Sequence, residues 1–293
     1  MKRINSKCAY DIIPFDENKH WIIGRGRAYI LNNNNEIEFV SPHIANITGV
    51  NWNDTRKQFI YYDTTGKCVF TDAFEQESYF KIFTTPFADH PIATFKNDYI
   101  YVHKSKKLKL FSVDKIKSFD IRFSENVNHI INYKDKYILF TEDEKRNYYI
   151  KLCAFDGKKM KCEKEISVSD YIDRMQIFDN GVLFFMNFTD SGEGARMNIC
   201  CVDIEKSDYR RLLFCDDVCK DPEKNNMNRF SVSPDKNRIA MIGDKSLQIY
   251  DVNEKRIVCN ENLLYGSDVC WRNNAELLVA TWNGLFVYSL PRK

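Results

Sequence analysis

The chain has 293 residues, with 43 Lys and Arg against 41 Asp and Glu and a formal net charge of +2. Because the two signs are interspersed, the sequence lacks the concentrated basic stripe typical of nucleic-acid-binding proteins. No stretch approaches the ~18 apolar residues of a membrane span, and the first residues lack the apolar core of a signal peptide. These features argue against nucleic-acid and membrane partners and predict a cytoplasmic protein. Its ten cysteines are then expected to be free thiols.

The residue composition favours β-strands. Aromatic residues make up 14% of the chain, with 21 Phe and 16 Tyr but only 11 Gly. Aromatic and β-branched side chains pack well on a pleated sheet. No segment shows a sustained apolar period of about 3.6 residues, so no substantial helix is expected. The short stretch Asp170–Gln176 is the nearest candidate for one.

A polar turn followed by an apolar strand recurs along the chain. A cluster drawn from Asp, Asn and Lys forms each turn, and Asp and Asn suit turns because their side chains bond their own backbone and tolerate left-handed geometry. The seven copies start at Phe15, Trp52, Phe95, Tyr133, Phe178, Ser233 and Arg272. Each copy predicts a turn that leads into the second strand of a repeated unit.

A further apolar strand follows each copy. The centres of these strands lie near Ile30, Val69, Leu110, Leu152, Cys200, Ile249 and Val287. The steps are about 40 residues, lengthening to about 48 around Cys200, which is the period of a four-stranded propeller blade. A first strand fits before each turn and a fourth fits after the third strand. The sequence therefore predicts an all-β, seven-bladed β-propeller of four-stranded antiparallel blades, as a single domain over residues 1–293. Six or eight blades are the alternatives.

The two ends of the chain predict how the propeller closes. The last unit has strands near Asp268–Trp271, Leu277–Thr281 and Leu285–Leu290 but no fourth strand, whereas Lys2–Ser6 precede the first strand of the first unit. We expect Lys2–Ser6 to complete the last blade, because this pairing removes an open sheet edge.

One stretch of the sequence, SVSPDKNRIAMIGDKSLQIYDVNEKRIV from Ser231 to Val258, resembles a WD40 repeat. Its Ser-Pro-Asp turn at Ser233 matches the usual turn between the first and second strands, and LQIYD matches the strand that ends in Trp-Asp, with Tyr250 in place of Trp. The Gly-His dipeptide of the family is absent, which leaves TolB-like and lactonase-like propellers as alternatives. The resemblance implies a rigid platform that presents loops to a protein or peptide partner.

Four side chains are expected near the mouth of the predicted central channel: His90, His129, Asp173 and Asp268. A ring of His and Asp residues there could hold a cation that polarises a substrate, as in a lactonase-like metal-dependent hydrolase. Inner strands also commonly carry polar residues beside a wet channel, and this reading is preferred. We therefore predict no metal site, and the hydrolase is the alternative.

The cysteines and glycines do not predict catalytic chemistry. Cys215 and Cys219 form a C-x-x-x-C pair, but zinc would need two further ligands and only carboxylates lie nearby. No GxSxG elbow and no glycine-rich phosphate loop occurs, so no catalytic residue and no cofactor is predicted. Cys153 and Cys162 are expected to face each other across a hairpin, as free thiols.

Two long polar segments are candidates for the partner-binding surface. They are Asn187–Arg196, which joins strands of the fifth unit, and Cys215–Asn228, which leads into the sixth. Both belong to the class of loops that lies on one face of a propeller, and binding residues concentrate on loops held by a rigid scaffold. The predicted partner-binding residues are Asp190, Glu193, Arg196, Asp216, Asp217, Lys220 and Lys224.

The preferred functional hypothesis is a non-catalytic protein-interaction scaffold that presents top-face loops to a protein or peptide partner. It rests partly on the fold resemblance. A metal-dependent hydrolase at the channel mouth and a binder of small ligands or nucleic acid are the alternatives. Bound metal would favour the hydrolase, and a salt-sensitive shift with RNA or DNA would favour the nucleic-acid binder.

Overall fold

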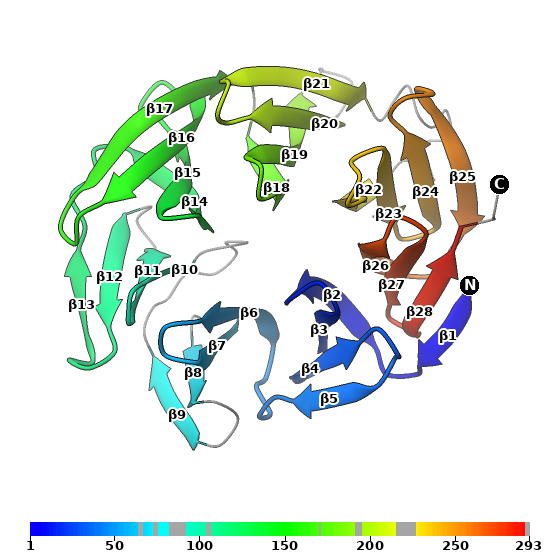
Figure 1. Cartoon of the computed structure of the whole chain (residues 1–293), viewed down its shortest axis with the longest axis horizontal. Helices are drawn as coiled ribbons and strands as arrows, with labels where there is room; N and C mark the ends of the chain where they lie inside the picture. Colours follow the sequence, from blue (N-terminus) through cyan, green and yellow to red (C-terminus); the bar gives the residue numbers. More distant parts are fainter. Residues whose placement is uncertain are drawn as a thin grey trace. The chain divides into compact units, whose positions relative to one another are not determined.

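The computed structural model describes residues 1–63, 67–72, 76–81, 92–103, 107–169, 171–190, 195–214 and 227–290. All regular elements in these ranges are β-strands, arranged in antiparallel sheets of four strands each. In most sheets the strand order follows the chain order, so each strand pairs with the one before it (Figure 1). No helix of the described part is long and apolar enough to cross a membrane.

The residues divide into two compact units. Unit 1 contains Met1–Ile47, Phe188–Cys200 and Arg211–Lys293, and unit 2 contains Thr48–Asn187 and Cys201–Arg210. The sheets of unit 1 are formed by β1 (Lys2–Asn5) with β26 (Gly266–Asn273), β27 (Glu276–Thr281) and β28 (Gly284–Ser289); by β2 (Ala9–Pro14), β3 (Lys19–Gly24), β4 (Arg27–Asn32) and β5 (Ile37–Val40); and by β22 (Met227–Val232), β23 (Arg238–Gly243), β24 (Ser246–Asp251) and β25 (Arg256–Asn262).

Unit 2 contains three further sheets. They are formed by β6 (Ile47–Asn53), β7 (Gln58–Asp63), β8 (Lys67–Asp72) and β9 (Gln76–Lys81); by β10 (Ile92–Phe95), β11 (Asp98–Val102), β12 (Leu108–Ser112) and β13 (Lys117–Asp120); and by β14 (Asn126–Tyr133), β15 (Lys136–Glu142), β16 (Tyr148–Phe155) and β17 (Met160–Val168). Of these, only Ile47 at the start of β6 is assigned to unit 1.

The remaining sheet contains β18 (Ile172–Ile177), β19 (Val182–Asp190), β20 (Ala195–Asp203) and β21 (Asp208–Phe214). The division into units passes through β19, β20 and β21. The prediction of seven blades in one ring is therefore wrong, because the β18–β21 sheet does not belong to a single compact unit. Six sheets each belong to one unit, with Ile47 the only residue outside, whereas the residues of this sheet are divided between both units. Its strands β19 and β20 are nine residues long, longer than the second and third strands of the other sheets, which have five to eight residues.

The N-terminal strand completes the last sheet, as the chain ends predicted. β1 pairs antiparallel with β28, with Lys2 opposite Val287 and Asn5 opposite Leu285 (Figure 1). Ile4 packs against a buried cluster that joins this sheet to the β2–β5 sheet and includes Ile12 and Leu278. Because β1 covers the hydrogen-bonding edge of β28, the pairing removes an exposed strand edge from unit 1.

The local predictions for two other segments had different outcomes. Cys153 in β16 pairs with Cys162 in β17, which confirms the predicted register, and both are free thiols. The helix candidate Asp170–Gln176 is wrong over its described part, because β18 begins at Ile172 and pairs with β19. Hydrogen bonding to a neighbouring strand outweighs a weak helical pattern in so short a segment.

The turns between first and second strands use Asp and Asn differently from the prediction. The left-handed position is occupied by Lys at Lys57, Lys96, Lys134 and Lys236. The Asp and Asn side chains instead accept backbone hydrogen bonds, as when Asn53 Oδ1 accepts from the Arg56 amide at 3.1 Å. Ser233 Oγ likewise accepts from the Arg238 amide at 3.0 Å. Side-chain acceptors of this kind stabilise a tight turn even when another residue adopts the left-handed conformation.

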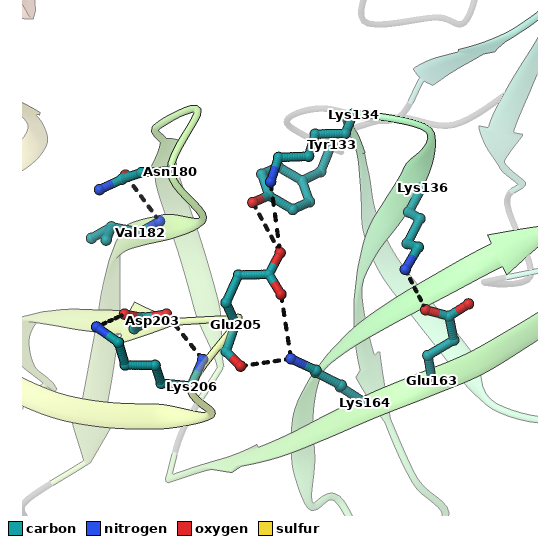
Figure 2. A network of polar contacts seen from close by, with 10 residues as sticks. All are labelled: Tyr133, Lys134, Lys136, Glu163, Lys164, Asn180, Val182, Asp203, Glu205 and Lys206. Atoms are coloured by element: carbon teal, nitrogen blue, oxygen red, sulfur yellow. Dashed lines mark hydrogen bonds and ion pairs between the residues drawn. The ribbon is translucent and has the colours of Figure 1, made fainter.

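Polar contacts link the β14–β17 sheet to the turn between β20 and β21. In unit 2, Glu205 accepts hydrogen bonds from the Tyr133 hydroxyl at 3.3 Å and from Lys164 Nζ at 3.4 Å (Figure 2). Lys164 also donates to the Glu205 carbonyl at 2.6 Å, and its hydrogen bond is the main cause that lowers the pKa of the Glu205 carboxyl. Tyr133 is buried, but Lys164 and Glu205 are partly exposed, and exposed ion pairs contribute little energy, so we interpret the network as a structural link.

Candidate interaction site

The predicted binding segment Asn187–Arg196 is largely β-strand. β19 extends to Asp190 and β20 begins at Ala195, so the expected loop is wrong at both ends. Asn187 in β19 pairs with Ile172 in β18 and is fully buried. Asp190 and Arg196 are strand residues whose side chains lie outside the described part of the structure. The other five predicted residues also lie outside it: Glu193, Asp216, Asp217, Lys220 and Lys224. Their role in binding stays a prediction.

The four channel-mouth candidates are only partly described. His90 and the side chain of Asp173 lie outside the described residues, as do Cys215 and Cys219. His129 is buried in unit 2, where its Nε2 lies 3.2 Å from the Ile172 carbonyl oxygen. Asp268 belongs to unit 1. Within the described ranges, no three His, Cys, Asp or Glu side chains lie close enough to hold a metal ion.

Asp268 lies beside a second carboxylate that the sequence did not single out. The Ile12 amide in β2 donates to Asp268 Oδ2 at 2.7 Å and to Asp11 Oδ1 at 3.2 Å. Asp268 is the third residue of β26, and Asp11 is the third of β2, so both occupy the same position in the first strand of neighbouring sheets. A position-by-position comparison of the first strands would have found the pair.

The environment of Asp268 favours its protonated form. Burial raises the pKa of this carboxyl well above its ordinary value, and the nearby charge of Asp11 raises it further, while Arg229 in β22 opposes the shift. A buried carboxylate lacks solvation, and two carboxylates in contact resist ionising together. Asp268 therefore keeps its proton to a higher pH than an ordinary aspartic acid does.

This proton predicts an unusual dependence of stability on pH. The folded state binds the proton of Asp268 more tightly than the unfolded chain does. The contribution of Asp268 to the free energy of unfolding is therefore most favourable below the ordinary carboxyl pKa, and it is lost as pH rises through the raised pKa of the folded state. The Asp268→Asn variant has no proton to lose at this position. The stability of the variant, measured against that of the natural protein, should therefore improve as pH rises from acid to neutral. Thermal unfolding of both proteins across this pH range measures the effect. The exposed Asp244→Asn is the control, and parallel stability curves for Asp268→Asn and the natural protein would contradict the assignment.

An exposed cluster of large apolar side chains lies at one end of unit 1. Leu264, Tyr265 and Trp282 are 71%, 59% and 63% exposed. The Trp282 amide donates to the Tyr265 carbonyl at 3.1 Å, and the Trp282 ring contacts Tyr10 edge-on, with 5.7 Å between the ring centroids. We call these four residues the aromatic patch.

Two chain connections position the aromatic patch. Leu264 and Tyr265 lie between β25 and β26, and Trp282 lies in the tight turn between β27 and β28. Gly284 closes that turn with a φ of 144°, a conformation that residues with a side chain rarely adopt. The sequence does carry a signal for the aromatic patch, because bulky apolar residues stand in turns, where polar residues are expected.

The fold recurs in solved structures, although no protein-family model and no curated protein matches the chain. Hydrazine synthase of Kuenenia stuttgartiensis is similar with a TM-score of 0.68 and 8% identity, over 97% of this chain and 96% of that one. The β-propeller domain of Cps50 (Swd1) from Myceliophteria thermophila has a TM-score of 0.67 and 10% identity, over 98% of both chains. The WD40 β-propeller domain of Doa1 has a TM-score of 0.58 and 13% identity, over 99% of this chain and 94% of that one.

The chain has a WD40-like β-propeller fold. At these identities the likeness extends to the fold and not to the activity. In a propeller, the loops from second to third strand and those between blades lie at one end of the sheets, because antiparallel strands alternate in direction. The β25–β26 connection and the β27–β28 turn are loops of these two classes. The aromatic patch thus belongs to the loop classes predicted to bind a partner, but it lies in different sheets from the predicted residues.

Proposed function

We propose that this propeller is a cytoplasmic, non-catalytic scaffold, a single domain over residues 1–293, that binds a protein or peptide partner through the aromatic patch. The observation that carries the proposal is the exposure of Leu264, Tyr265 and Trp282 on two connections that are joined by the hydrogen bond from the Trp282 amide to the Tyr265 carbonyl. Exposed apolar clusters are uncommon on monomeric proteins and mark interaction surfaces. Trp and Tyr are also the residues that most often dominate binding energy at interfaces.

Substitution in the aromatic patch is expected to release the partner without unfolding the protein. Trp282→Ser should weaken binding by roughly 30-fold, the effect of losing about 2 kcal/mol at a central aromatic contact. Affinity capture of the natural and variant proteins, followed by quantitative mass spectrometry, measures the loss. Ile116→Ser is the matched control, because Ile116 is 61% exposed at the β12–β13 turn, far along the chain from the patch. Equal recovery of the same proteins by all three baits would refute the assignment of the site.

The polar segments around Asp190 and Asp216 are proposed as a second part of the binding surface, on the argument from loop class alone. Replacing residues 191–194 with a shorter turn tests this part separately. The lactonase-like hydrolase is the alternative function, and it requires bound metal. Stoichiometric calcium or zinc in the purified protein would favour the hydrolase over the scaffold.

A further inference from the structure

The aromatic patch has cationic neighbours on several chain segments. Arg3 in β1 donates through Nη2 to the carbonyl of Asn283, the residue after Trp282, and to the Ser6 carbonyl at 3.4 Å. Both acceptors are neutral, so within the described residues these contacts do not neutralise the guanidinium charge. Arg3 is exposed. The result is a positive charge held against the turn that carries Trp282.

A second cation lies near Tyr10. The β3–β4 turn packs closely on Cys8, since a Cβ on Gly24 would lie 2.8 Å from the Cys8 carbonyl oxygen. Arg25 follows Gly24 in that turn and is exposed. A hydrogen bond with Cys8 is the main cause that raises the pKa of the Tyr10 phenol, and the nearby charge of Arg25 opposes this rise. Lys7 is also exposed in the segment that leads to Cys8. Arg3 thus lies against the turn that carries Trp282, and Arg25 lies near Tyr10, the edge-on partner of Trp282.

The charges on the segments that frame the patch are mostly positive. The β23–β24 turn adds Asp244 and Lys245, whose carbonyl groups accept from the amides of Gly266 and Leu263 at 3.1 Å and 2.8 Å. Asp244 is exposed and Asp11, next to Tyr10, is half-buried, against the exposed cations Arg3, Lys7, Arg25, Arg27 and Lys245. Asp268 is buried below the surface. An apolar surface with a cationic rim complements a partner that is apolar at its centre and acidic around it.

We propose that the aromatic patch binds an acidic peptide segment that carries a large apolar side chain. The apolar side chain contacts Trp282 and Tyr265, and Asp or Glu residues on either side of it pair with Arg3 and Arg25. Arginine suits this role because its planar guanidinium binds carboxylates with two parallel hydrogen bonds. The proposal rests on the proposed scaffold function and specifies the chemistry of the partner.

The test uses the full chain and a fluorescein-labelled synthetic peptide in which Asp and Glu flank two Phe residues. Two matched peptides replace every acidic residue with Lys, or both Phe residues with Ser. We expect fluorescence anisotropy to show binding of the acidic Phe peptide only, weakened at high ionic strength because salt screens exposed charges. Trp282→Ser and the double variant Arg3→Glu with Arg25→Glu should each weaken binding about tenfold or more.

The control for the charge reversal is Lys255→Glu, which changes an exposed Lys in the β24–β25 turn, at the opposite end of the strands from the patch. Arg25→Glu alone, which leaves β1 intact, repeats the test if the double variant unfolds. Absence of binding to the acidic Phe peptide, equal binding of the Lys peptide, or undiminished binding by both charge-reversal variants would overturn the proposal. Trp282-dependent binding to phosphatidylserine vesicles without binding to the peptide would also overturn it, in favour of a membrane.

These outcomes separate the two proposals. If captured proteins are lost from Trp282→Ser but retained by the charge-reversal variants, the scaffold function stands and the acidic partner is wrong. If Trp282→Ser retains every captured protein, the patch is not the binding site and both proposals fail.

Discussion

Deletion of Lys2–Ser6 is expected to lower the melting temperature by roughly 10 °C, the largest effect that we predict for a change at the surface. The deletion removes the strand that pairs with β28 and the side chain of Ile4, which packs on the cluster containing Leu285 and Val287. Burial of one Ile side chain contributes about 2 kcal/mol, and each lost ladder hydrogen bond about 1 kcal/mol. The total is on the order of 4 kcal/mol.

Two point variants separate the side-chain contribution from the backbone contribution. Ile4→Asn keeps the β1–β28 ladder but removes the apolar contact, so it should lose about half of the stability that the deletion loses. Lys2→Gln changes an exposed side chain and should have no measurable effect. The deletion should also promote self-association, since it exposes the edge of β28. Light scattering detects this, and a deletion variant that melts with the natural protein would show that β1 does not stabilise the sheet.

Glu125→Ala is expected to reduce the free energy of unfolding by about 2–3 kcal/mol, because it leaves a buried ammonium with one partner fewer. The side chain of Lys151 in β16 is only 5% exposed, and its Nζ contacts Glu125 Oε1 at 2.5 Å and Glu165 Oε2 at 2.8 Å. Glu165 is its register partner in β17, and Glu125 immediately precedes β14. The two carboxylates raise the pKa of Lys151 against the opposing effect of burial, so the ammonium is charged at neutral pH.

The order of effects within this cluster distinguishes a buried charge from a simple loss of contact. Lys151→Met should cost less than Glu125→Ala, because Met fills a similar volume and the remaining carboxylates of Glu125 and Glu165 are 26% and 48% exposed. Combining Lys151→Met with Glu125→Ala should then cost less than the sum of the two single variants. Urea unfolding of the three variants measures these differences. Additive losses, or a Lys151→Met variant less stable than Glu125→Ala, would contradict the interpretation.

Much of the fold was predictable because it depends on interactions that are local in sequence. Alternating apolar residues and polar turns indicated four-stranded units, and the hairpin turn at Asp156 set the register that places Cys153 opposite Cys162. The pairing of β1 with β28 joins the two ends of the chain, yet it was also predicted, because a spare strand and a missing strand imply each other. Weak patterns failed where strand pairing competes, as at Ile172–Ile177, which forms β18.

The candidate site depends on contacts that no local pattern encodes. The Ile12 amide and Asp268 are separated by 256 positions in the sequence, and only the packing of β2 against β26 brings Asp11 and Asp268 together. Tyr10, Tyr265 and Trp282 come from three separate connections and strands, and each alone is an unremarkable aromatic residue. The amino-acid sequence by itself determined the strands, their order within each sheet and, over the residues that the structure describes, the absence of a long helix. The tertiary structure decided which side chains from distant strands share a surface, because burial and exposure depend on how sheets pack and not on neighbours in the chain.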